Sequence, residues 1–461
     1  MFDFGIALPV LGLLVVVVFL GLHIAVALAA CSLIGLYIIL GSFDITMMTF
    51  ASTAFQGLRG YTFAALPLFM IMGEFISRSG AAQDLYVGIN RALKGVVGRL
   101  ALATVLGNAV FAFLTGVSIA AAAAFTRIAY PQMRAMGYDR GTALGVIAGS
   151  SCLGMLIPPS NLMILWAILV EESIGRLFLA GIIPGLMLAT LFVIYVMSNA
   201  YFRPHLYGEG ISVTPPPEPE AQSLGAAAIP SVADLDSITS KDILISTVCM
   251  GGLIASVLGG IWFGAFTATE AAGVGSLLAL AFAIVVKGLR LPDVAAGILQ
   301  VAKTAAPLLI MILMALLYSR TLALTGIGNS IEDFFSSGSI PPWAVLVFMV
   351  CIWFLLGMLI DSKSIMLLTV PIFAPLGELI GYNPIAFAII GILAIEAGIL
   401  TPPFGLIVYT VKAAAADDEV STLRIFAAAT PYWICLLIVL TAVAIWPGLA
   451  TYIGDITFNK G

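Results

Sequence analysis

Two matched interruptions lie inside apolar stretches of this chain. The segment GMLIPPS begins at Gly154 and GILTPPF begins at Gly398, so in both a glycine is followed after three residues by paired prolines. Proline removes a backbone donor and clashes with the preceding helical turn, so each pair should break a helix. Inside a bilayer, a broken helix survives only where its backbone is buried in protein or lines a water-filled cavity. The breaks therefore predict an internal polar site.

The composition is that of a polytopic membrane protein. Of 461 residues, 61% are hydrophobic and only 9% are charged, whereas about a quarter of the residues in a soluble domain are charged. We expect about ten transmembrane helices plus two re-entrant hairpins at 100–132 and 342–376, with both termini outside, because this arrangement leaves most Lys and Arg residues inside. The five cysteines form no CxxC pair, which gives no indication of a metal site or disulfide framework. The sequence has no basic stripe of the kind that indicates a nucleic-acid partner.

The two interruptions belong to an internal repeat. A shift of 244 residues aligns Pro131 with Pro375, Gly137-Tyr138 with Gly381-Tyr382, and the two proline pairs, without a gap. The charge count gives the copies opposite orientations, and inverted repeats with interrupted helices are typical of secondary transporters. The fold class we predict is an all-α membrane protein with inverted repeats. Its parts are a first repeat at 1–203 with a broken helix at 142–170, a Pro-rich cytoplasmic linker at 204–240, and a second repeat at 241–461 with a broken helix at 385–411.

Several polar residues lie at the predicted hairpin tips and breaks. Thr115, Gly116 and Ser118 lie at the tip of the first hairpin, where hydroxyls and freed carbonyls could surround a cation. Asp361 lies at the tip of the second hairpin and Glu396 just before the second break, and intramembrane carboxylates are usually functional. Lys363 could instead simply neutralise Asp361.

Two further segments mix apolar and basic residues. Residues 79–99 and 288–303 are therefore expected to form interfacial helices on the inner membrane surface.

Four motifs together resemble those of one transporter family. GYDRGTALGVIAGSSCLGMLIPPS, SIGRLFLAGIIPG, TATEAAG and GILTPPFG are similar to segments of the large permease subunit of tripartite ATP-independent periplasmic (TRAP) transporters, the DctM-like family. The resemblance implies an elevator-type transporter of the bacterial inner membrane, driven by sodium ions and without another cofactor. It also implies two partners, a small four-helix membrane subunit (DctQ-like) and a periplasmic binding protein (DctP-like) that delivers a small organic anion.

The same resemblance implies positions for the binding sites. The residues assigned to sodium are Thr115, Gly116, Ser118, Gly154, Pro158 and Pro159 in the first repeat, and Gly357, Asp361, Gly398 and Thr401 in the second. Those assigned to the substrate are Ser160, Asn161, Ser362, Glu396, Pro402 and Pro403. The chain departs from the family pattern at two positions. Many members carry more serines at the first hairpin tip, where this chain has Thr115 and Val117, and Glu396 stands where others often have Asn.

Other classes of protein fit the sequence less well. An intramembrane enzyme would need a facing nucleophile and base, and no Ser-His or paired-Asp arrangement is evident. Two hairpins with one polar site each favour alternating access over a channel. A stand-alone sodium-coupled dicarboxylate symporter shares the repeat pattern and remains the alternative. No Arg lies in either break to clamp a carboxylate, so helix ends and amides would have to hold an anion.

Overall fold

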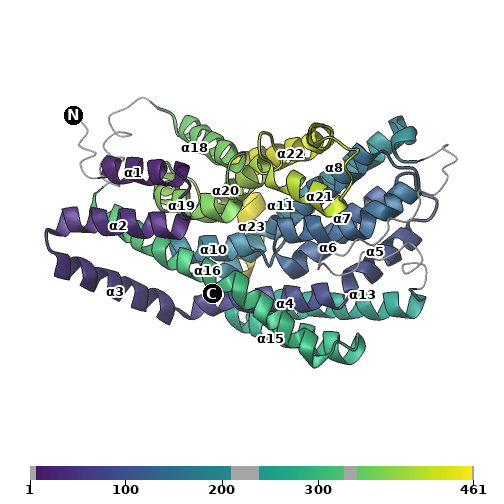
Figure 1. The fold of residues 1–461 in the computed structure, drawn as a ribbon, viewed down its shortest axis with the longest axis horizontal. Coiled ribbons are helices and arrows are strands. Elements are labelled where there is room, and N and C mark those ends of the chain that lie inside the picture. The colour runs from purple at the N-terminus through teal and green to yellow at the C-terminus, as the bar shows by residue number, and fades with distance from the viewer. Residues whose placement is uncertain (1–6, 209–237, 327–339, 459–461) are drawn as a thin grey trace.

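The structure, a computed structural model, describes residues 7–208, 238–326 and 340–458. Throughout these ranges the chain forms helices and no strand, which confirms the predicted all-α fold (Figure 1). The first half contains α1 (Ala7–Phe19), α2 (Ile24–Leu40), α3 (Phe43–Arg59), η1 (Tyr61–Ala64), α4 (Ala65–Arg78), α5 (Ala81–Ala92), α6 (Arg99–Thr115), α7 (Ser118–Ala135), α8 (Arg140–Ser151), α9 (Leu153–Leu156), α10 (Asn161–Val170), α11 (Ile174–Phe202) and η2 (Pro204–Leu206).

The second half continues the helical pattern. It contains α13 (Ser240–Ile254), η3 (Ala255–Gly259), α14 (Gly260–Trp262), α15 (Ala268–Ala281), η4 (Phe282–Val286), α16 (Leu291–Leu324), α18 (Pro342–Gly357), α19 (Ser362–Leu379), α20 (Pro384–Gly398), α21 (Leu406–Ala415), α22 (Thr422–Ile445) and α23 (Gly448–Phe458). In the described ranges, seven helical segments are long and apolar enough to cross a bilayer, and the bent pair of α3 with η1–α4 would make an eighth.

Matched residues begin the matched helices of the two halves. Asp139 caps α8, and its carboxylate accepts a hydrogen bond from the backbone N–H of Thr142 at 2.9 Å. Asn383, 244 residues later, caps α20 by accepting from the N–H groups of Ile385 and Ala386. Asp and Asn are among the best helix N-caps because their side chains satisfy amides that have no partner in the helix. The repeat seen in the sequence thus starts two helices by the same local chemistry.

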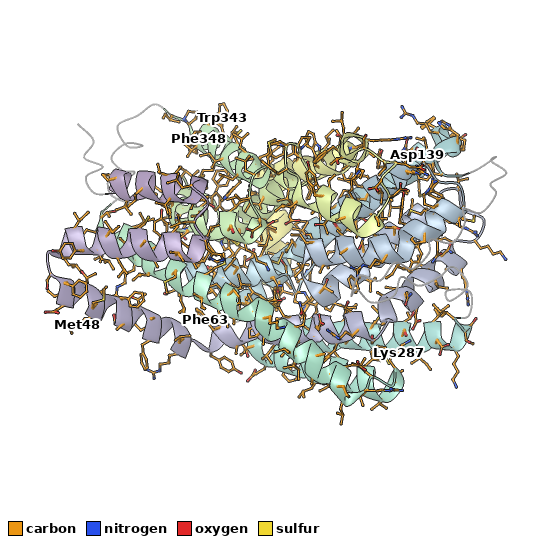
Figure 2. The ribbon with its side chains drawn as sticks, in the orientation of Figure 1. Met48, Phe63, Asp139, Lys287, Trp343 and Phe348 are labelled. Atoms are coloured by element: carbon orange, nitrogen blue, oxygen red, sulfur yellow. The ribbon has the colours of Figure 1, made fainter. Side chains whose placement is uncertain are left out.

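The hairpins are formed by α6 with α7 and by α18 with α19. In Figure 1, α18 and α19 lie toward the left end of the molecule, whereas α6 and α7 lie toward the right. Trp343 and Phe348 on α18 and Met48 on α3 are exposed side chains of the left half (Figure 2). Asp139 and Lys287 are labelled toward the opposite end. Large exposed apolar side chains are expected where a helix faces lipid.

The helices pack into two groups. One group contains α2, α3, α4, α15 and α16, in which α16 packs on α2, α3 and α4, and α4 packs on α15; α13 joins it through η3 and α15. The other group contains α6 to α11 and α18 to α23, joined by the contacts of α7 with α21, of α8 with α22, of α10 with α19 and of α11 with α22 and α23. In Figure 1, α3, α4 and α15 run along the lower side and α18, α21 and α22 along the upper side. Helix α5 lies between the groups because it packs on α6 and on α13, and α16 crosses onto α19. We call these two groups the frame and the core.

An aromatic cluster joins the two repeats inside the core. The rings of Trp166 on α10, Trp353 on α18 and Phe387 on α20 lie with centroids 5.3 to 6.0 Å apart. The indole N–H of Trp353 donates to the hydroxyl of Thr369 at 2.8 Å, so its one polar group is satisfied. This aromatic packing stabilises the contact between the two repeats inside the core.

Two segments differ from the sequence expectation or fall outside it. Residues 288–303 do not form a separate interfacial helix, because α16 runs without interruption from Leu291 to Leu324 despite Pro307. Most of the predicted linker at 204–240 lies outside the described residues. Its first residues form η2 (Pro204–Leu206), and Tyr207 lies buried against Tyr138 at a ring distance of 5.5 Å.

A buried ionic cluster fixes α5 to the frame. Asp84 on α5 forms an ion pair with Lys287 and accepts a hydrogen bond from the hydroxyl of Ser246 at 2.5 Å. Removal of one partner leaves the other charge buried without compensation, which is strongly destabilising.

We therefore expect Asp84→Ala to lower the stability of the purified protein by roughly 2 kcal/mol, measured as a lower thermal unfolding temperature in detergent. The matched control is Asp44→Ala, because Asp44 is exposed in the first turn of α3. Equal melting of both variants would contradict the assigned role of Asp84.

Candidate functional site

The tip of the first hairpin packs directly onto the first helix break. The backbone N–H of Asn161 donates to the carbonyl of Gly116 at 3.2 Å. Gly116 has φ +60, and a Cβ at this position would lie 2.5 Å from the carbonyl oxygen of Pro159. Glycine is therefore required both for the turn and for the close approach.

The first break is short and buried. Helix α9 ends at Leu156, and α10 begins at Asn161 after Ile157, Pro158, Pro159 and Ser160. Ser160 caps α10, because its hydroxyl accepts from the N–H of Met163 at 3.4 Å and donates to the carbonyl of Met155 at 2.5 Å. The Pro158-Pro159 peptide bond is cis. The paired prolines thus precede a half-helix, as the sequence indicated.

The tip of the second hairpin packs onto the second break in the same manner. A Cβ on Gly357 would lie 2.8 Å from the Cα of Gly398, and a Cβ on Gly398 would lie 2.4 Å from the carbonyl oxygen of Phe354. The N–H of Phe404 donates to the carbonyl of Met358 at 3.2 Å. This close contact between two backbones depends on the paired glycines.

The second break is longer and more open than the first. It runs from Ile399 to Gly405, with a cis bond between Pro402 and Pro403, and α21 begins only at Leu406. Both prolines are exposed, whereas Pro158 and Pro159 are buried. Thr401 is buried, and its hydroxyl donates to the carbonyl of Ala397 at 2.8 Å.

Glu396 connects the tips of both hairpins. Its carboxylate accepts a hydrogen bond from the hydroxyl of Ser118 at 2.7 Å and another from the hydroxyl of Ser362 at 3.1 Å. The side chain is only 1% exposed. Ser118 is the first residue of α7 and Ser362 the first of α19. Residues of both hairpins and of the second broken helix therefore meet at one carboxylate.

The repeat is symmetric in its serines but not in its charge. Ser362 lies 244 residues after Ser118, and Glu396 lies 244 residues after Cys152. The thiol of Cys152 lies 3.9 Å from the backbone carbonyl of Glu396, so the two matched positions are adjacent. One repeat supplies a carboxylate where the other supplies a small thiol. Cys152 was missed from the sequence, although the shift of 244 residues pairs it with Glu396.

Two helix N-termini lie at the carboxyl group of Glu396. Helices α7 and α19 begin at its two hydrogen-bond donors, and a helix N-terminus carries roughly half a positive charge. None of the ion pairs found among the described residues includes Glu396. The protein therefore stabilises this carboxylate with hydroxyls and helix ends rather than with Lys or Arg.

The comparisons with known proteins agree with this architecture. A family model described as "Tripartite ATP-independent periplasmic transporter, DctM component" matches residues 11–449. The chain belongs to the DctM family. It is 31% identical over 410 residues to the C4-dicarboxylate TRAP transporter large permease protein DctM of Pseudomonas aeruginosa, which covers 88% of this chain and 89% of that protein.

Two further relatives extend the comparison. This DctM-family chain is 28% identical to the ectoine TRAP transporter large permease protein TeaC of Halomonas elongata, with 95% of this chain and 97% of that protein covered. Its fold is similar to that of the YdaH transporter of Alcanivorax borkumensis, with a TM-score of 0.58, 14% identity and 89% of each chain covered. The second likeness concerns the fold alone.

Two other residues assigned from the DctM family resemblance have local roles in the structure. Asp361 caps α19, because its carboxylate accepts from the N–H of Ser364 at 3.2 Å and also from the hydroxyl of Ser364. Thr115 donates its hydroxyl to the carbonyl of Phe111 at 3.1 Å. These bonds leave lone pairs on both side chains, so neither residue is prevented from binding a cation.

Among the described residues, four amide side chains have a buried group without a partner, and two of them, Asn161 and Asn108, lie on the elements of this site. Asn161 is 2% exposed, and its Nδ2 group forms no hydrogen bond with the described residues. Asn108 on α6 donates to the hydroxyl of Ser150 at 2.7 Å, while its Oδ1 atom has no partner in the same part of the chain. Unsatisfied buried groups are uncommon and often mark ligand sites. Asn108 was missed, although it is a polar residue within an apolar hairpin.

We expect Ser362→Ala and Ser118→Ala each to destabilise the protein by about 1–3 kcal/mol, because a buried carboxylate loses a donor. The measurement is thermal unfolding in detergent. The control is Ser276→Ala, which removes a hydroxyl bonded only to the carbonyl of Gly273 in its own helix. The assigned bonds would be wrong if all three variants melted alike.

Proposed function

We propose that this DctM-family chain is the large membrane subunit of a TRAP transporter that uses a sodium gradient to import a small organic acid. A periplasmic binding protein delivers the acid, and a small four-helix membrane subunit assembles with this chain in the bacterial inner membrane. The observation that carries the proposal is the junction at Glu396, where Ser118 and Ser362 bring both hairpins to one buried charge. Membership of the DctM family supports the partners.

The two broken helices are the proposed sodium sites. Sodium is a hard cation and binds carbonyl and hydroxyl oxygens, which the unpaired backbone of the breaks and the nearby hydroxyls provide. The first site uses Thr115 and Ser118 with the backbone from Gly154 to Pro159. The second uses the backbone around Gly357 and from Gly398 to Thr401, with Asp361 close by. In both sites a hairpin tip closes onto the break of its own repeat, as the contacts of Gly116 and Gly357 indicate.

The substrate is proposed to bind between the two hairpin tips. The unpaired Nδ2 group of Asn161 and the hydroxyl of Ser362 lie at the starts of α10 and α19, where backbone N–H groups also favour an anion. Ser160, Glu396 and the exposed Pro402-Pro403 segment complete the proposed binding region.

The proposed movement is a displacement of the core along the frame. Contacts within each helix group are more extensive than those between them, and the Trp166 cluster links the two repeats within the core. Helix α5 is anchored to the frame through Asp84, so the connection between α5 and α6 is the proposed hinge. In this proposal a site formed by both repeats moves as one unit.

Uptake by the reconstituted transporter tests the proposal. The chain is inserted into proteoliposomes with its small membrane subunit, and the binding protein loaded with its ligand is added outside. We expect uptake only when the binding protein and an inward sodium gradient are both present. Uptake that is unchanged when choline replaces sodium contradicts the coupling. Uptake without the binding protein instead supports the stand-alone symporter.

A second test removes the charge of Asp361 but keeps a side chain that can cap α19. Asn caps a helix about as well as Asp, so Asp361→Asn should insert and fold normally. We expect sodium-dependent uptake to fall about tenfold or more, because the second cation site loses a carboxylate. The sodium dependence of the initial rate is measured beside the wild type, and an unchanged dependence would remove Asp361 from the site. Asp44→Asn, which changes an exposed residue of α3, is the control.

A further inference from the structure

A carboxyl group, that of Glu396, already occupies the junction of the hairpins before a substrate arrives. The carboxylate of Glu396 occupies the position where the N-termini of α7 and α19 converge. These two helix ends are the groups that would otherwise attract an anion. In the described part of the chain, no Lys or Arg forms an ion pair with Glu396. The positive potential of these two helix N-termini is therefore already directed at a carboxylate of the protein itself.

A substrate with two negative charges fits this junction poorly. Its second carboxylate would lie close to Glu396 in a region of low dielectric, where repulsion between like charges is strong. It would also compete for the hydroxyls of Ser118 and Ser362, which already donate to Glu396. A dianion supplies acceptors only, so the buried carboxylate would lose donors and gain none.

A substrate with a protonated nitrogen fits the junction better. Its N–H groups can replace the serine hydroxyls as donors to Glu396, and its positive charge is attracted to the carboxylate. The carboxylate of the same molecule can accept a hydrogen bond from the Nδ2 group of Asn161, which is buried and has no partner among the described residues. Glu396 and Asn161 thus supply the acceptor and the donor that the two ends of a small amino acid need.

These two groups belong to neighbouring elements. Glu396 lies near the end of α20, and Asn161 begins α10, which packs against α20. The N–H of Asn161 bonds to Gly116, two residues before the Ser118 that bonds to Glu396. The tip of the first hairpin therefore connects the proposed carboxylate end of the substrate with its proposed nitrogen end.

We propose that Glu396 selects the charge of the substrate, and that this transporter carries a zwitterionic acid with a protonated nitrogen rather than a dicarboxylate. Glu396 binds the nitrogen and Asn161 the carboxylate. This proposal rests on the proposed function, because it assumes that the substrate binds between the hairpins.

Three ligands of similar length test the charge preference. Succinate, butyrate and 4-aminobutyrate are titrated into the purified complex of this chain with its small membrane subunit, at one fixed sodium concentration, and binding is followed by calorimetry. The binding protein is left out so that its own selectivity does not contribute. We expect 4-aminobutyrate to bind about tenfold or more tightly than succinate, with butyrate between them.

Charge variants assign the preference to Glu396. Glu396→Gln should reduce the ratio between the two affinities about tenfold, whereas Glu396→Asp, which keeps the charge, should retain the order of the three ligands. Glu378→Gln makes the same substitution at an exposed position near the end of α19 and should leave the ratio unchanged.

Several results would overturn the proposal. It is wrong if the wild type binds succinate as tightly as 4-aminobutyrate, if 4-aminobutyrate does not bind, or if Glu396→Gln leaves the ratio unchanged. If Glu396→Gln does not fold, the order of the three ligand affinities in the wild type and in Glu396→Asp tests the proposal instead. A sodium-driven importer that prefers succinate would refute the charge selection alone. Loss of all sodium-dependent uptake in the reconstituted system would instead refute the proposed function.

Discussion

A carboxylate buried inside a membrane protein must be compensated, and this requirement determines the geometry around Glu396. A charge removed from water without partners is very unfavourable. The compensation comes from two hydroxyls and two helix ends that belong to different hairpins. Both hairpin tips must therefore reach the same point, which in turn requires the close backbone contacts at Gly116 and Gly398. A side chain at either glycine would move a tip away from the carboxylate.

The internal repeat places equivalent residues around this site, and a difference at one matched position gives the site its carboxylate. The matched caps give the two repeats the same local structure, and the matched serines Ser118 and Ser362 both donate to Glu396. Glu396 and its counterpart Cys152 differ, so the site has a charge that the repeat alone would not give. The breaks differ as well, since Pro158 and Pro159 are buried while Pro402 and Pro403 are exposed. A symmetric scaffold thus contains a site with two distinct halves.

The sequence predicted the helices and their breaks better than the tertiary contacts between them. Apolar length, paired prolines and glycine turns act over a few residues, and these signals predicted the helical fold and both breaks. The contact between Ser118 and Glu396 joins residues 278 positions apart, so only tertiary packing could reveal it. The cap formed by Asp361 depends on the start of α19 at Ser362. The expected interfacial segment at 288–303 is instead part of α16. The helix continues through Pro307 to Leu324, so no break separates this segment from the following span.

The junction also bears on how the proposed movement could be controlled. Ser118, Ser362 and Glu396 all belong to the core, so their bonds do not resist displacement along the frame. They resist separation of the two hairpins, which the proposed binding of a substrate between them would require. A ligand that supplies donors to Glu396 replaces the serine bonds as it enters, whereas a ligand without donors breaks them uncompensated. On the proposed cycle, the same carboxylate would therefore keep the empty core closed and determine which ligand can open it.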